Sequence, residues 1–267
     1  RQAVYFDVAD GRMIFAIPRD GATYVGTTDT NYSENIERPR VSESDVAYLL
    51  NAVNEAFDMK PLTKADVQST WAGLRPLIHE DGKSPSELSR KDEIFISEHG
   101  LISIAGGKLT GYRKMAERTV DLAMTQLHTE FQVTRKLSGG TFHSFNAFLA
   151  EVGETTLTQT QLTSLYHKYG SNTFVILADL DLKEKDQTAA ILLAELRYST
   201  ENEMVNELSD FLIRRTGRLY FEKPIADKYA EVLNIELSKL LGLTAEQTAQ
   251  SLDTYLKESE DVLSFTE

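Results

Sequence analysis

A strand-like run leads through two glycines and a lysine into a helix at residues 103–117, Ser-Ile-Ala-Gly-Gly-Lys-Leu-Thr-Gly-Tyr-Arg-Lys-Met-Ala-Glu. Gly106 and Gly107 allow a ligand to approach the backbone closely. A helix opening at about Thr110 presents free N–H groups and a positive dipole end, and Lys108 adds a full charge. We call residues 106–110 the glycine corner. Its backbone and charge are suited to binding an anion or stabilising a developing negative charge. The alternative interpretation is that the glycines only form the turn between strand and helix.

The segments before the glycine corner are predicted to form a mixed or antiparallel sheet with flanking helices. Strand patterns at 3–8, 12–18 and 23–28, punctuated by Asp-Gly pairs, indicate an antiparallel meander. An amphipathic run at 46–57 after Ser42 predicts a helix. Further elements are expected as a strand over 67–77, a hairpin of 94–96 with 101–105, and a helix from about Thr110 to Leu127.

Beyond a polar, glycine-containing join at 136–143, the chain is helix-rich. Helical periodicity covers 189–197, 203–213 and 226–241, and Thr244 with Gln247 forms a capping box that opens the last helix. We therefore predict an α+β fold in which residues 1–135 form the sheet-containing domain and residues 136–267 form an all-α C-terminal domain.

Composition limits the possible partners and locations. Twenty-eight basic and 41 acidic residues give a net charge of −13, which disfavours nucleic acid or an anionic membrane surface as the main partner. The absence of cysteine excludes disulfides and thiolate metal sites. No apolar run approaches the roughly 20 residues of a membrane-spanning helix, and we expect a cytoplasmic protein with little membrane contact. The oligomeric state stays open, a homo-oligomer included.

Several separated motifs occur in an order and spacing that carry a family resemblance. They are the glycine corner and the segments 11–18, 24–29, 69–77, 84–90, 192–198 and 210–216. The set closely resembles the FAD-dependent glycerol-3-phosphate dehydrogenases and alpha-glycerophosphate oxidases over nearly the whole chain. That family carries a Gly-x-Gly-x-x-Gly dinucleotide fingerprint near its N-terminus, which this sequence lacks. The sequence also begins with Arg1 and enters a strand-like pattern at once. We therefore expect this chain to be the C-terminal portion of a flavoenzyme, with the remaining N-terminal part as its partner.

The resemblance implies which residues contact the ligands. Arg75, Arg90 and Lys108 fall at substrate-contacting positions, and three cations suit the phosphate of glycerol 3-phosphate. Arg75 lies among apolar residues where an unpaired charge is costly, and a salt bridge is its structural alternative. A solvated loop is the alternative for Arg90. The backbone of Gly106, Gly107, Lys108, Leu109 and Thr110 is expected to face FAD and to favour negative charge at the N1–O2 edge of the flavin.

Other chemically capable residues are expected to be structural. His99, His128, His143 and His167 have surface or loop contexts, and His79 is not favoured as the base, which stays unidentified. Thr27-Thr28-Asp29 is expected to form a turn at the end of a strand. Trp71 is expected to lie in the core or in the wall of a pocket. Arg214-Arg215 is expected to complement a helix dipole or to pair with nearby acidic helices rather than to form a second anion site.

The implied reaction is oxidation of sn-glycerol 3-phosphate to dihydroxyacetone phosphate, with oxygen favoured over a quinone as the electron acceptor. Two other hypotheses stay open. In one, the chain alone is a non-catalytic module that holds the substrate-side sheet and a helical interaction domain. A related amine or amino-acid oxidase is disfavoured, because three cations suit a phosphate better than a single carboxylate.

Overall fold

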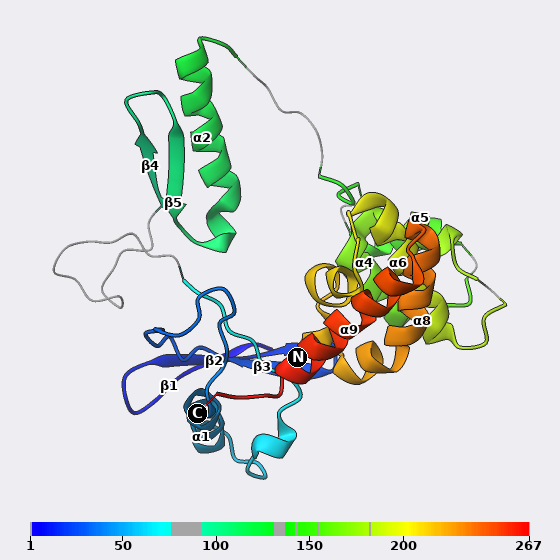
Figure 1. Cartoon of the computed structure of the whole chain (residues 1–267), viewed down its shortest axis with the longest axis horizontal. Coiled ribbons are helices and arrows are strands. Elements are labelled where there is room, and N and C mark those ends of the chain that lie inside the picture. Colours follow the sequence, from blue (N-terminus) through cyan, green and yellow to red (C-terminus); the bar gives the residue numbers. More distant parts are fainter. Residues whose placement is uncertain are drawn as a thin grey trace. The chain divides into compact units, whose positions relative to one another are not determined.

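The computed structural model describes residues 2–75, 92–130, 137–141, 144–153, 155–181 and 183–266 (Figure 1). Backbone contacts divide the chain into two compact units. Unit 1 comprises Arg1–Asp29, Arg40–Ala72 and Lys136–Glu267, and unit 2 comprises Thr30–Pro39 and Gly73–Arg135. The boundary expected at residue 135 stays a prediction about domain organisation. Within the described ranges, no helix has the length and apolar character needed to cross a membrane.

Unit 1 begins with the antiparallel meander that the sequence predicts. Its strands are β1 (Val4–Asp7), β2 (Met13–Arg19) and β3 (Ala22–Gly26), in the order β1-β2-β3. Ile14 and Ala16 alternate inward from β2 and are buried, as a strand with one covered face requires. Gly11, at φ +82°, makes the turn between the first two strands.

Helix α1 (Glu43–Ala56) follows the meander and confirms the helix expected there. Ser42 and Asp45 form a reciprocal capping box at its start, which satisfies two backbone N–H groups that lack helical partners. Its buried residues are Val46, Ala52 and Val53. A 3₁₀ turn, Lys64–Asp66, comes next along the chain.

The strand expected over 67–77 does not form in its described part, residues 67–75. The backbone N–H of Thr70 donates to the carbonyl of Val262 at 2.8 Å instead of joining a strand ladder. The described residues accordingly form two separate antiparallel sheets, one in each unit, rather than the single mixed sheet that we expected.

In the described residues of the C-terminal part of unit 1, the named regular elements are helices, as predicted. Its helices are α3 (Phe145–Val152), α4 (Gln159–Tyr169), α5 (Thr173–Ala178), α6 (Gln187–Asn202), α7 (Arg218–Phe221), α8 (Lys223–Leu241) and α9 (Ala245–Asp261). Thr244 and Gln247 form the capping box expected before α9. Two apolar clusters share α6: Leu192 and Leu196 pack with α8 and α9, whereas Ala194 and Tyr198 pack with α4 and α5. Helix α6 is therefore the central element of this part.

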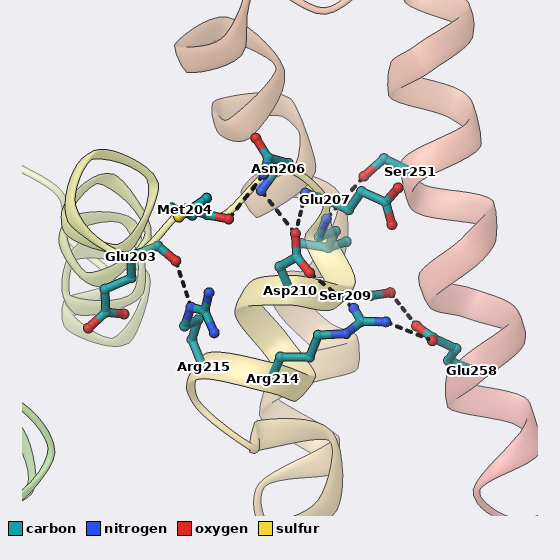
Figure 2. Close-up of polar contacts among 11 residues, drawn as sticks. Glu203, Met204, Asn206, Glu207, Ser209, Asp210, Arg214, Arg215, Ser251 and Glu258 are labelled. Atoms are coloured by element: carbon teal, nitrogen blue, oxygen red, sulfur yellow. Dashed lines mark hydrogen bonds and ion pairs between the residues drawn. The ribbon is translucent and has the colours of Figure 1, made fainter. Parts of the chain in front are cut away.

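The helix predicted over 203–213 is interrupted in its first half. Helix α6 ends at Asn202, Met204 adopts a left-handed conformation, and helical structure resumes at Leu208 before a π-helical segment, Asp210–Arg215. Figure 2 shows the cause: the Asp210 carboxylate accepts the backbone N–H groups of Asn206 at 3.0 Å and Glu207 at 3.1 Å. Such a side chain offers the backbone an alternative to helical hydrogen bonding.

The ion pair of Glu195 with Arg218 is buried inside the helical part. Glu195 of α6 is fully buried and Arg218 of α7 is 6% exposed, and a guanidinium nitrogen lies 2.6 Å from the carboxylate. Burial opposes the charge of Arg218, but Glu195 and Glu222 outweigh it and raise the pKa of Arg218. Glu222 lies 3.2 Å from the same guanidinium. The pair thus connects the central helix to α7.

We predict that Glu195→Gln lowers the free energy of unfolding by about 3 kcal/mol, because it leaves Arg218 buried without its main partner. Chemical denaturation measures the loss. Lys239→Ala, which removes an exposed partner of Glu236 at 3.6 Å, is the control and should leave the midpoint nearly unchanged. The pair Glu195→Leu with Arg218→Met should recover most of the stability. A single variant as stable as the parent contradicts the prediction.

Candidate functional site

The hairpin that carries the glycine corner forms as predicted in unit 2. Strands β4 (Asp92–Ile96) and β5 (Ile102–Gly106) pair antiparallel, with Asp92 opposite Gly106. The reversal uses Gly100 at φ +83°, whose N–H donates to the carbonyl of Ser97 at 2.9 Å. Strand β5 delivers the chain directly into the corner.

Both glycines of the corner occupy backbone conformations that favour glycine. Gly106 lies at φ +76° and Gly107 at φ +85°. A Cβ atom at Gly107 would lie 2.6 Å from Sδ of Met115 and 3.2 Å from Cβ of Asp92. The positive φ therefore favours glycine at position 107, and the close approach to Cβ of Asp92 adds a packing reason, whereas the flexible end of the Met115 side chain can move aside.

The helix after the corner begins slightly later than expected. A 3₁₀ turn, Leu109–Gly111, comes first, with the N–H of Gly111 donating to the carbonyl of Lys108 at 2.8 Å. Helix α2 (Tyr112–Leu127) then runs to the predicted end. Its N-cap is Gly111, which contributes no capping side chain, and its first turn holds no acidic residue. The positive end of the helix dipole is thus not compensated by its own side chains.

The side chains of the corner face solvent in this structure. Lys108 and Thr110 are exposed, and Leu109 is 90% exposed. Lys108 contributes a full positive charge next to the uncapped helix start, and Arg113 adds a second charge in the first turn. This arrangement can bind an anion or stabilise negative charge on a bound group by main-chain N–H groups, dipole and cation together.

Supporting contacts around the corner were not found by sequence reasoning. Arg118 of α2 forms an ion pair with Asp92 of β4, joining the helix to the strand. Met115, one turn before Arg118, packs over Gly107. The only sequence signal for these contacts was the i, i+3 spacing of Met115 and Arg118, which places them on one face of a helix.

The predicted substrate cations fall within the residue range of unit 2. Arg75 is exposed rather than enclosed by apolar side chains, and its neighbours Trp71 and Leu74 are themselves about half exposed. Arg90 lies outside the described residues, as do His79, His143 and the whole segment 84–90.

Several residues predicted to be structural have the surface positions or pairing partners expected of them, and their roles stay predictions. His99, His128 and His167 are exposed. Arg214 lies 3.2 Å from Asp210 and 3.9 Å from Glu258 of α9, so it pairs with acidic groups as expected (Figure 2). Arg215 donates to the carbonyl of Glu203 at 2.7 Å. The carbonyl of Thr28 accepts a hydrogen bond from Arg12 at 2.6 Å, in line with a turn role for 27–29.

A separate pocket of about 470 Å³ lies in the helical part. Among the described residues its lining is apolar or hydroxylic: Val152, Thr155, Thr156, Phe174, Leu177, Ala178 and Leu180. A phosphate-bearing ligand needs charged donors, so this pocket does not compete with the glycine corner as an anion site.

Comparison with known proteins gives matches along nearly the whole chain. A family model described as FAD dependent oxidoreductase matches residues 1–113, and one described as the C-terminal domain of alpha-glycerophosphate oxidase matches residues 132–263. Aerobic glycerol-3-phosphate dehydrogenase of Bacillus subtilis (strain 168) is 46% identical over 83% of this chain and 43% of its own length. The protein of that name from Staphylococcus haemolyticus is also 46% identical, over 92% of this chain and 48% of its own length.

A solved structure agrees with these matches. The glycerol-3-phosphate dehydrogenase from Bacillus halodurans, complexed with FAD, has a TM-score of 0.84 and 41% identity, covering 99% of this chain and 54% of that one. The chain spans about half the length of the relatives that it matches. The matches define the class, that of FAD-dependent oxidoreductases. Within it, the chain belongs to the family of FAD-dependent glycerol-3-phosphate dehydrogenases and alpha-glycerophosphate oxidases.

We predict that Gly107→Ala destabilises the corner more than Gly100→Ala does. Both positions have positive φ, but a Cβ meets Met115 only at Gly107, whereas nothing lies within 4 Å of a Cβ at Gly100. An alanine in the left-handed backbone conformation costs about 1 kcal/mol at either site. The additional destabilisation of Gly107→Ala over Gly100→Ala therefore measures the packing contribution. Hydrogen exchange of β5 and α2 reports the difference. Adding Met115→Ala should recover part of the loss at Gly107, and equal effects of the two alanine variants would refute the packing argument.

Proposed function

We propose that this chain supplies the substrate-side and helical portions of an FAD-dependent enzyme that oxidises sn-glycerol 3-phosphate to dihydroxyacetone phosphate. The observation that carries the proposal is the glycine corner, where two glycines, an uncapped helix start and Lys108 favour negative charge. The names of the relatives support the substrate, and the bound FAD of the Bacillus halodurans protein supports the cofactor.

Different residues of this chain are proposed to contact the substrate and the flavin. Arg75 and Arg90 are proposed to hold the phosphate, since a guanidinium forms two parallel hydrogen bonds with a phosphate group. Lys108 is proposed to contact oxygen atoms of the substrate or of the flavin pyrimidine. The backbone of residues 106–110 is proposed to face the flavin, whose role when bound is to accept the electrons released by the substrate.

The corner fits this cofactor on chemical grounds. The absence of acidic residues from the first turn of α2 leaves the helix dipole available to a negatively charged flavin edge. The described residues include no dinucleotide fingerprint, and we propose that the rest of the FAD site belongs to the remaining part of the flavoenzyme. The general base that takes the hydroxyl proton of the substrate is not assigned.

The electron acceptor and the setting are further parts of the proposal. The match to the C-terminal domain of alpha-glycerophosphate oxidase favours oxygen, whereas the relatives named dehydrogenases favour another acceptor such as a quinone. We propose a cytoplasmic protein whose residues 1–135 belong to the FAD and substrate domain and whose residues 136–267 form the helical domain. On its own, this chain is proposed to be a non-catalytic module.

We expect glycerol 3-phosphate to bleach the flavin absorbance when it is mixed with the full-length enzyme under argon in a stopped-flow instrument. Glycerol, which lacks the phosphate, is the matched control and should react far more slowly at the same concentration. Rapid return of the absorbance on mixing with air identifies an oxidase, and return only with a quinone identifies a dehydrogenase. Absence of bleaching with glycerol 3-phosphate would rule out the proposed substrate.

We expect Arg75→Ala and Lys108→Ala each to lower kcat/KM of the full-length enzyme, because each removes a charge-assisted contact. The loss of transition-state stabilisation calculated from the ratio of kcat/KM values should be about 2–3 kcal/mol for each variant. Lys239→Ala, which removes an exposed positive charge of α8, is the control and should leave kcat/KM nearly unchanged. Steady-state kinetics at constant ionic strength measures the three variants. An unchanged kcat/KM in either of the first two removes that residue from the site.

A further inference from the structure

An acidic side chain lies directly against the glycine corner. Asp92 opens β4 and is the register partner of Gly106, the last residue of β5. A Cβ atom built on Gly107 would lie 3.2 Å from Cβ of Asp92, so the two residues are packed together. The side chain of Asp92 is 23% exposed, and partial burial strengthens the field of a charge because less water screens it. An unopposed carboxylate here would repel the negative charge that the corner favours.

Among the described residues of the hairpin and the first half of α2, the other acidic side chains point away from the corner or are paired with a lysine. Glu93 follows Asp92 on β4, and successive side chains of a strand point to opposite faces of the sheet. Glu98 lies in the turn at the other end of the hairpin. Glu117 pairs with Lys114, 2.7 Å away, and both are more than half exposed. Asp92 is therefore the carboxylate whose charge matters most at the corner.

Arg118 reaches this carboxylate from α2. Its guanidinium forms an ion pair with Asp92, so the charge of Asp92 is opposed from the neighbouring helix. Met115, three residues earlier on the same helix, packs over Gly107. Arg118 and Met115 therefore lie on the helix face that is turned toward the corner and the start of β4.

The ion pair closes a loop of the chain around the corner. Strand β5 leads into the corner, the corner leads into α2, and Arg118 returns to the residue that pairs with Gly106. None of the residues of α2 is fully buried, so polar contacts carry a larger share of its attachment to the hairpin. The contact of Arg118 with Asp92 therefore holds the start of α2 near the corner and neutralises the carboxylate at the same time.

We propose that Arg118 is a positioning residue of the glycine corner: it holds the Asp92 carboxylate and offsets its charge, so that the corner keeps its preference for negative charge. The inference rests on the proposed function, because it takes from there that the corner faces the flavin. Arg118 exerts its role through Asp92 rather than by contact with a ligand. The alternative is an exposed ion pair that links two elements without influence on the flavin.

The midpoint potential of the flavin in the full-length holoenzyme tests the proposal, measured by reductive titration against a reference dye. Arg118→Gln leaves the Asp92 charge unopposed, and a negative charge near the corner disfavours the reduced, negatively charged flavin. The preference for the reduced form should fall about tenfold, which is about 30 mV for a two-electron couple. Asp92→Asn should raise the potential, because it leaves the positive charge of Arg118 without its partner.

The double variant separates an effect of charge from the loss of a structural contact. Asp92→Asn with Arg118→Gln removes both charges, so its potential should return close to that of the parent. If the pair only linked strand and helix, the double variant would be perturbed at least as much as either single variant. Arg118→Lys keeps the charge and should retain most of the parent potential.

Lys114→Gln is the matched control, since it removes one positive charge from the same helix. Lys114 is 69% exposed and its partner Glu117 is 53% exposed, so solvent screens both charges. The potential should therefore change much less than in Arg118→Gln. Thermal unfolding midpoints and flavin content are measured for every variant. If Arg118→Gln binds too little flavin to be titrated, the upward shift expected for Asp92→Asn tests the proposal by itself.

Each outcome supports or overturns one statement. A fall of the potential in Arg118→Gln, a rise in Asp92→Asn and recovery in the double variant support the positioning role. An unchanged potential in either single variant, a double variant as low as Arg118→Gln, or an equal fall in Lys114→Gln overturns it, even in a parent that oxidises glycerol 3-phosphate. A parent whose flavin is titrated by the dye system but is not reduced by glycerol 3-phosphate overturns the proposed substrate instead, because the potential is measured without substrate.

Discussion

The buried pair between Glu195 and Arg218 is the constraint from which the arrangement of unit 1 follows. Helix α6 lies between the two apolar clusters, and its single fully buried carboxylate accepts the guanidinium that opens α7. A buried charge tolerates little displacement of its partner, because any separation leaves both groups desolvated and unpaired. The place of α7 is therefore specified more narrowly than apolar packing alone would specify it.

From α7 this constraint extends to the sheet and to the segment that precedes Arg75. Tyr220 and Phe221 belong to the same short helix as Arg218, and their rings pack against Trp71. The carbonyl of Tyr220 also accepts the hydrogen bond of Ser69. A four-residue helix thus connects the helical core, the meander and the extended segment, which explains why these distant parts of the sequence form one unit.

The parts of the fold that depend on neighbouring residues were predictable from the sequence. The meander follows from alternation and Asp-Gly turns, and the starts of α1 and α9 follow from capping boxes at Ser42 and Thr244. The predicted secondary structure was wrong where a distant or unexpected group forms the hydrogen bonds of the backbone. Thr70 binds Val262 rather than a strand, and Asp210 takes the N–H groups that a continuous helix would use. The site was predictable as a glycine corner with a cation, but the packing of Met115 over Gly107 depends on tertiary structure that no local pattern encodes.

The glycine corner presents main-chain N–H groups rather than a set of polar side chains, and this affects how the site can change during evolution. Every residue type except proline carries the same backbone donor, so most substitutions at Leu109 or Thr110 leave the number of donors intact. The vulnerable positions are instead Gly106 and Gly107, whose conformations few other residues adopt. Sequence drift in this region is therefore expected to change the shape and charge at the rim of the corner long before it removes the donors, which would let related enzymes diverge in what they bind while keeping the same backbone donors.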